Sequence, residues 1–187
     1  MAPIFYNRIA YTQVTAEWMK EIDASNLDAA EISGTGGEGH GFKSHVSFEY
    51  PEYDICSGPI RGTDGEVLTF DIILAEQVWE HLEFPYAATR NVLKMLRPGG
   101  FFWLAVPFFA RWHAFPTDCS RWSARGLHNL LVECGFQPQE IRAQQWGNRP
   151  CALRDMSPFW AIYDPSRDTL ENDPEFPVMS WAMARKA

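Results

Sequence analysis

The sequence predicts an α/β fold: a mostly parallel sheet with helices on both faces and an antiparallel closing strand. Apolar runs at 27–32, 67–75 and 101–106 have the near-continuous hydrophobicity of strands buried on both faces. Apolar residues at helical spacing follow Pro85 and Ser123, between the later strands. Strands and helices that alternate in this way form a parallel sheet with its helices on the faces.

Composition predicts one compact domain over 1–187, with an N-terminal arm and helix at 1–26 and a proline-rich loop at 157–177. The chain is 46% hydrophobic, enough for a sizeable core, and its net charge of −8 argues against a nucleic-acid partner. Four scattered cysteines and no apolar leader favour a reduced, cytoplasmic protein. No apolar run is long enough to span a membrane.

The first half of the chain contains a helix and short strands. A helix capped by Thr15 is expected to run to Asp23 after an arm of about a dozen residues. Strands are expected at 45–50 and 53–56. Too few residues separate Gly41 from the first of these strands for a crossover helix, so this part of the sheet should be abbreviated.

The second half shows clearer boundaries. A helix should begin at Pro85 and stop at the R-P-G-G sequence of 97–100. A second helix should run from a Ser123 cap to Gly135. A strand at 140–146 and a closing strand at 178–183 complete the pattern.

A glycine-rich turn follows the first strand, where open α/β sheets bind their ligands. Glu31 is the acid within the apolar run, which ends at Ile32 and is followed by Ser33, Gly34, Gly36 and Gly37. Glycines let the backbone approach a ligand closely, although glycine-rich turns also follow many strands for purely conformational reasons.

Four segments together resemble the class I S-adenosylmethionine-dependent methyltransferases, in the compact type 11 form. These are EISGTGG at 31–37, FDIILAEQVWEHL at 70–82, LRPGGFFWLAVP at 96–107 and LLVECGF at 130–136. The resemblance covers roughly 27–145 and implies a Rossmann-like sheet, S-adenosylmethionine as cofactor and methyl transfer as the activity. The usual acid-x-Gly-x-Gly-x-Gly pattern is altered, because Ser33 stands in place of the first glycine.

The resemblance also implies cofactor-binding residues. Glu31 and the turn would hold the amino-acid end of the cofactor, and Glu49 would accept hydrogen bonds from the ribose hydroxyls. A carboxylate suits a vicinal diol, and acids near the strand ends, Glu80 among them, favour a sulfonium cation. The alternative for each acid is a solvated strand end. The expected set is Glu31, Ser33, Gly34, Gly36, Glu49, Asp54 (with Ile55 and Cys56 near the adenine), Glu76 and Gln77.

The acceptor side should come from 107–122, which follows the strand ending at Val106 and places charged side chains among aromatic ones. His113 could act as a general base, Asp118 could orient it, and Arg121 or Arg111 could hold an anionic group of the acceptor. The residues 146–149 could line the same mouth. The main alternative is an aromatic loop that only closes the core. A minor alternative is that Cys119 acts as a nucleophile. No metal site is expected.

The sequence therefore predicts an enzyme that transfers the methyl group of S-adenosylmethionine to a small-molecule acceptor by in-line displacement. The alternatives are a non-catalytic methyltransferase-fold assembly protein and an S-adenosylmethionine-using cyclase or lyase. Apolar residues in the arm and loops further predict a homodimer, in which the arm or the 157–177 loop of one subunit covers the crevice of the other.

Overall fold

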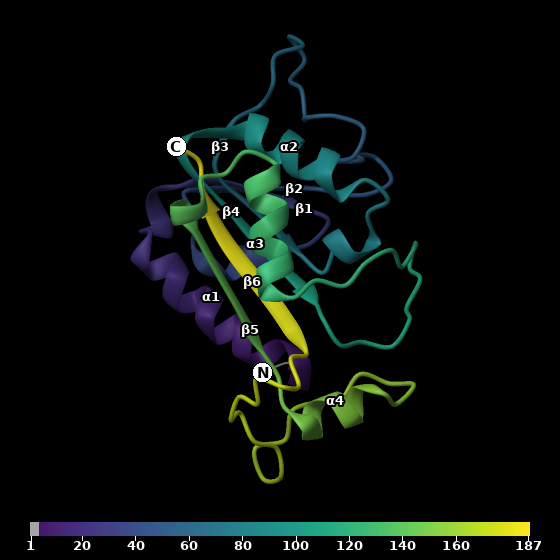
Figure 1. Ribbon diagram of the computed structural model, residues 1–187. Coiled ribbons are helices and arrows are strands. Elements are labelled where there is room, and N and C mark those ends of the chain that lie inside the picture. Colours follow the sequence, from purple (N-terminus) through teal and green to yellow (C-terminus); the bar gives the residue numbers. More distant parts are fainter. Residues whose placement is uncertain (1–3) are drawn as a thin grey trace.

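A computed structural model describes residues 4–187 and contains a single six-stranded sheet with strand order β2-β1-β3-β4-β6-β5. The first four strands are parallel, and β6 runs antiparallel to both β4 and β5. The predicted mostly parallel sheet with an antiparallel closing strand is therefore confirmed (Figure 1). The strands are β1 (Asp28–Ile32), β2 (Ser44–Phe48), β3 (Phe70–Glu76), β4 (Leu96–Pro107), β5 (Ile141–Trp146) and β6 (Met179–Arg185).

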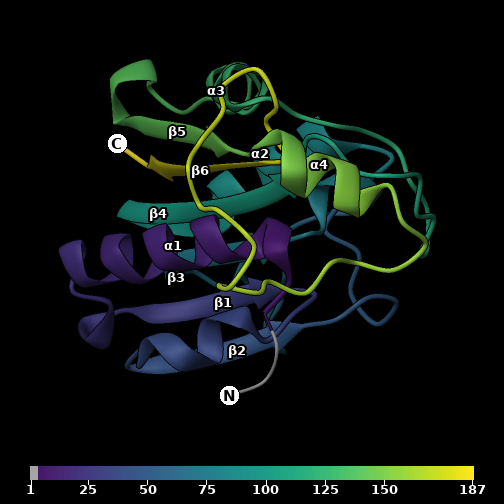
Figure 2. The same cartoon turned by 90° about the horizontal axis from the view of Figure 1, so that it is seen from below.

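Helices cover both faces of the sheet, as Figures 1 and 2 show from two directions. Alternate residues of the central strands point to opposite faces, so Phe102 and Leu104 of β4 join one core cluster while Trp103 joins the other. The helices α2 (Pro85–Met95) and α3 (Ala124–Glu133) pack into the first cluster, and α1 (Ile9–Glu21) packs into the second. None of the helices within 4–187 is long and apolar enough to cross a membrane.

The predicted starts of α2 and α3 and the predicted end of α3 are confirmed. Pro85 occupies the first turn of α2. The Ser123 hydroxyl accepts a hydrogen bond of 3.1 Å from the Gly126 N–H at the start of α3. Gly135 follows that helix with a φ of 112°, a conformation that glycine adopts without a Cβ penalty.

The N-terminal arm is not free, which corrects the sequence-based prediction. Helix α1 begins at Ile9, six residues before the predicted cap, and Thr15 lies buried in its middle, where its hydroxyl donates to the Tyr11 carbonyl (2.7 Å). Tyr6, Ile9 and Tyr11 are buried against their own chain, so they cannot cover the crevice of a partner. Residues 1–3 of the predicted arm lie outside the described part of the chain.

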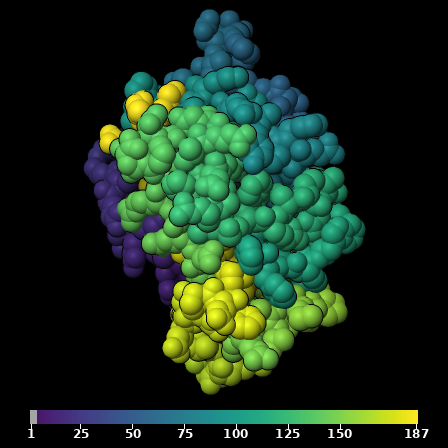
Figure 3. All heavy atoms as spheres, in the orientation of Figure 1, coloured from purple at the N-terminus to yellow at the C-terminus, as the bar shows by residue number. Residues whose placement is uncertain are grey.

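Three further differences concern the connections. Residues 53–56 form a turn instead of a strand, and the R-P-G-G sequence belongs to β4, where the pairing with β3 shifts register between Phe70 and Ile72. The short helix α4 (Arg149–Asp155) was not predicted, and with the 156–177 segment it forms the lower end of the molecule in Figure 3. Between β1 and β2 the chain forms only a 3₁₀ helix (Gly36–His40), as the short connection predicted.

Candidate functional site

The glycine-rich turn folds back onto β1 and is held by the end of β2. The N–H of Ser33 donates to the Phe48 carbonyl (2.9 Å), and Ser33 adopts a φ of 52°, in the left-handed region that favours glycine. Ser33 thus stands where the first glycine was expected. Its left-handed backbone conformation is the physical reason why glycine is preferred at that position.

Glu31 stabilises this turn from within. Its side chain is 1% exposed, and its two carboxylate oxygens accept hydrogen bonds from the N–H groups of Gly36 (2.8 Å) and Gly37 (2.9 Å). The Nε2 atom of His45 on β2 lies 2.9 Å from the same carboxylate. Glu31 does not line the large cavity described below, and its carboxylate supports the turn.

Glu76, at the end of β3, lies beneath the same turn. It accepts hydrogen bonds from the Trp103 indole N–H (3.0 Å) and from the Tyr11 hydroxyl (3.5 Å), and burial raises its pKa. A Cβ on Gly36 would approach a Glu76 carboxylate oxygen to 2.9 Å, so a larger residue there would displace the Glu76 side chain. Gly34, Gly36 and Glu76, like Glu31, are absent from the cavity wall.

A cavity of about 710 Å³ opens at the carboxyl ends of β1, β2 and β3. Its volume is in the usual range for small-molecule and cofactor sites. Four of the eight expected cofactor-binding residues line it, namely Ser33, Glu49, Asp54 and Gln77, and Ile55 and Cys56 line it as well. The expected acceptor segment 107–122 contributes Phe115, Pro116 and Thr117 to the wall. The wall is completed by residues that were not singled out from the sequence: Ile32, Tyr50, Tyr53, Val78, His81, Leu82, Glu83 and Phe84.

Glu49 and Gln77 retain hydrogen-bonding capacity in this wall. The Oε1 atom of Glu49 accepts from the Gly34 N–H (3.1 Å) and from the Ser47 hydroxyl, which leaves Oε2 free to accept from a ligand. Gln77 has a φ of 59°, and its buried Nε2 has no hydrogen-bond partner within 4–187. Asp54 is already engaged, since its carboxylate accepts from the Cys56 N–H and the Ser57 hydroxyl.

The expected acceptor residues lie together in the loop after β4. The Asp118 carboxylate accepts hydrogen bonds from both terminal nitrogens of Arg121 and from the His113 N–H (2.7 Å). The hydrogen bonds from Arg121 hold the pKa of Asp118 down at about 2.

Because its guanidinium is paired with Asp118, Arg121 fixes the loop, which corrects the expectation that it is free to hold an acceptor. Arg111 lies over the Trp160 ring at 4.1 Å and is likewise engaged. The residues 146–149 do not line the cavity. Trp146 is buried and donates its indole N–H to the Leu170 carbonyl, and Asn148 caps α4.

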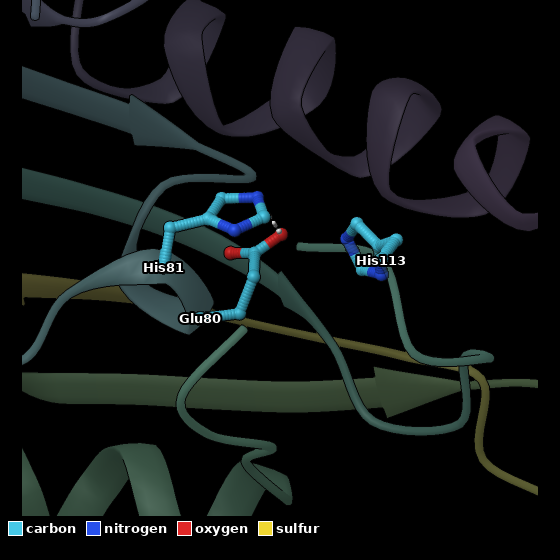
Figure 4. A group of neighbouring side chains, drawn as sticks. All are labelled: Glu80, His81 and His113. Atoms are coloured by element: carbon cyan, nitrogen blue, oxygen red, sulfur yellow. Dashed lines mark ion pairs between the residues drawn. The ribbon is translucent and has the colours of Figure 1, made fainter. Parts of the chain in front are cut away.

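His113 is brought close to Glu80 and His81, which belong to a 3₁₀ helix (Trp79–His81) after β3 (Figure 4). One ligand atom from each of the three residues lies within 4.8 Å of the other two. The Glu80 carboxylate is fully buried without a hydrogen bond to the described residues, and burial raises its pKa to about 7. His81 also lines the cavity, so the cluster adjoins it.

Only part of this arrangement could be inferred from the sequence. The adjacent pair of Glu80 and His81 follows a buried strand, but its meeting with His113 depends on the path of the loop after β4 and is invisible in the sequence. The roles of Tyr11, His45 and Trp103 beneath the turn had no sequence signal, because each comes from a different element.

Comparisons with known proteins support the fold. Residues 38–104 match the family described as a methyltransferase domain. An S-adenosylmethionine-dependent methyltransferase from Mesorhizobium loti superposes with a TM-score of 0.60 at 14% identity, covering 94% of this chain and 100% of the other. One from Archaeoglobus fulgidus gives 0.56 at 10% identity, covering 94% of each chain. At these identities the likeness is one of fold. The curated proteins include no match to the sequence.

Proposed function

We propose that this chain, a class I methyltransferase by its fold and family match with S-adenosylmethionine as cofactor, transfers the cofactor's methyl group to a small-molecule acceptor by in-line displacement. The observation that carries the proposal is the cavity at the carboxyl ends of β1, β2 and β3, which is where open α/β sheets bind their ligands. The methyl donor is already activated, so positioning of the acceptor accounts for most of the catalysis.

The cofactor would occupy the part of the cavity near β1 and β2. The free Oε2 atom of Glu49 is suited to a ribose hydroxyl, and the orphaned Nε2 of Gln77 is suited to a ligand acceptor atom. The apolar wall of Tyr53 and Ile55 is suited to the adenine ring. The glycine-rich turn closes this end of the cavity. It would be held in place by Glu31, Gly34, Gly36 and Glu76, which would therefore support cofactor binding indirectly.

The acceptor would enter from the side formed by His81, Phe84 and the 115–117 segment. His113 remains our candidate for the group that takes a proton from an attacking hydroxyl or amine. Asp118 and Arg121 would position it by fixing the loop, and neither would contact the acceptor.

Calorimetry with S-adenosylmethionine and its demethylated product tests the cofactor site. Glu49→Gln keeps the shape of the side chain but weakens one hydrogen bond to a charged group, which is worth about 1.5 to 3 kcal/mol, so affinity should fall roughly tenfold or more. Glu52→Gln, an exposed acid outside the cavity wall, is the matched control.

His113→Ala should leave cofactor affinity within about threefold, because this side chain is on the acceptor side. Wild-type protein that binds neither compound would refute the proposal. Equal affinities for wild type and Glu49→Gln would remove Glu49 from the site.

A further inference from the structure

We propose that Glu80, His81 and His113 form a binding site for a divalent transition-metal ion at the acceptor side of the cavity, with Zn²⁺ as the ion that suits them. Two imidazoles and one carboxylate are a recurrent three-residue ligand set for zinc, which leaves a further coordination position open. Figure 4 shows the three side chains facing one another from the 3₁₀ helix after β3 and the loop after β4.

The geometry of the cluster is close to that of a coordination sphere. The Nε2 atom of His81 lies 3.7 Å from Oε1 of Glu80, and all three ligand atoms lie within 4.8 Å of one another. Two ligand atoms at tetrahedral positions around zinc are roughly 3.4 Å apart. An ion would therefore shorten the distances between the three ligand atoms by up to about 1.4 Å, within the reach of small side-chain rotations.

Each histidine ring is oriented by a hydrogen bond from its Nδ1 atom. His81 Nδ1 lies 2.5 Å from the Thr117 carbonyl oxygen, and His113 Nδ1 lies 3.0 Å from the Arg111 carbonyl oxygen. A carbonyl can only accept, so Nδ1 carries the proton in each ring and Nε2 keeps its lone pair. Histidines that bind metals characteristically donate their second ring N–H in this way.

The buried carboxylate is the independent observation that points to a cation. Glu80 is fully buried, and neither of its oxygens has a hydrogen-bond partner within 4–187. Burial of an unpaired carboxylate is strongly unfavourable, and buried charges are ordinarily paired or coordinate metals. The nearby Arg121 is taken up by Asp118 and does not reach Glu80 as a hydrogen-bond donor.

The position of the site suggests its use, and this step rests on the proposed function. His81 lines the cavity beside Thr117, so the open coordination position would face the acceptor. A hydroxyl bound there would lose its proton to solvent. Its oxygen would then form a bond to the methyl carbon as the methyl–sulfur bond breaks, leaving the neutral thioether. With an ion bound, His113 holds the ion and does not act as the base.

Metal binding is tested on the full chain after treatment with a chelator, by titration with Zn²⁺ in a calorimeter and with Co²⁺ by visible absorption. We expect one equivalent to bind to the wild type, with the absorption bands of Co²⁺ at a nitrogen and oxygen site. His81→Ala, His113→Ala and Glu80→Gln should each weaken binding by at least about tenfold.

His40→Ala is the matched control, because it removes a histidine outside the cluster and should bind like the wild type. Glu80→Gln changes no volume, so it keeps the test decisive if an alanine variant fails to fold. Wild type that binds no Zn²⁺, or cluster variants that bind it as tightly as the wild type, would overturn the proposal. Binding of S-adenosylmethionine is measured separately on the chelator-treated protein, so loss of the metal site and failure of the methyltransferase proposal give different results.

Discussion

Asp155 on α4 should make the stability of the fold depend on pH in a direction opposite to that of an ordinary ion-paired acid. Its side chain is fully buried, and neither carboxylate oxygen has a hydrogen bond to the described residues. Burial raises its pKa from 3.8 to about 6, although the neighbouring Ala161 backbone and Asn7 side chain, and to a smaller extent Arg111 and Arg154, oppose the shift. A shift of roughly two pKa units corresponds to about 3 kcal/mol between the protonation states.

The sign of the effect follows from proton binding. The folded protein binds this proton more tightly than the unfolded chain, so the contribution to stability is full below a pH of 3.8 and is lost as the pH rises through about 6. Between about pH 7.5 and about pH 5 the wild type should gain about 1.4 kcal/mol from this one group. Asp155→Asn should remove that dependence.

Urea unfolding of both proteins at the two pH values isolates the effect as a double difference. The unfolding free energy of Asp155→Asn minus that of the wild type should be about 1.4 kcal/mol larger near pH 7.5 than near pH 5. Glu175→Gln, which neutralises an exposed acid, should show little such change. A difference between wild type and Asp155→Asn that is equal at the two pH values, or larger at the lower one, would refute the reasoning.

Two further predictions concern packing and assembly. Gly147→Ala should destabilise the fold by about 3 kcal/mol or more, because a Cβ there would lie 2.0 Å from the Phe176 carbonyl oxygen, whereas Gly39→Ala meets no atom within 4 Å and should be nearly neutral in the same urea titration. The chain should form a homodimer in which the 157–177 loop covers the partner's crevice, since Phe159 in that loop is 80% exposed. Light scattering should then give twice the monomer mass, and a monomer mass with cofactor binding intact would exclude the dimer.

The sheet was predictable because its signals are local. The β3 and β4 strands are buried on both faces, so they appear in the sequence as continuous apolar runs, and Pro85, Ser123 and Gly135 mark helix ends by their own backbone chemistry. The start of α1 was missed for a physical reason. Its first turn has no side-chain cap, and its position depends on the burial of Tyr6 and Tyr11 against distant segments.

The site was only half predictable, because sequence order locates the ends of strands but not the direction of side chains. Glu49 and Gln77 come directly after β2 and β3, and both line the cavity. Glu31 and Glu76 lie at the carboxyl ends of strands in the same sheet, yet their carboxylates lie beneath the glycine-rich turn. There they form hydrogen bonds with backbone N–H groups, His45 and Trp103. Hydrogen-bond donors from other elements determine whether an acid at a strand end lines the cavity or binds the turn.

The loop after β4 holds His113 in a fixed position. Arg121 and Asp118 form a charged pair inside the loop, and Asp118 also accepts the His113 N–H, so the backbone at His113 is fixed before any ligand arrives. The Arg111 carbonyl accepts a hydrogen bond from the ring, and the neighbouring Glu80 carboxylate has no hydrogen-bond partner among the described residues. A loop that only closed the core would not need a preorganised imidazole facing a buried carboxylate. The arrangement is the kind that positions a reacting group or a metal ligand.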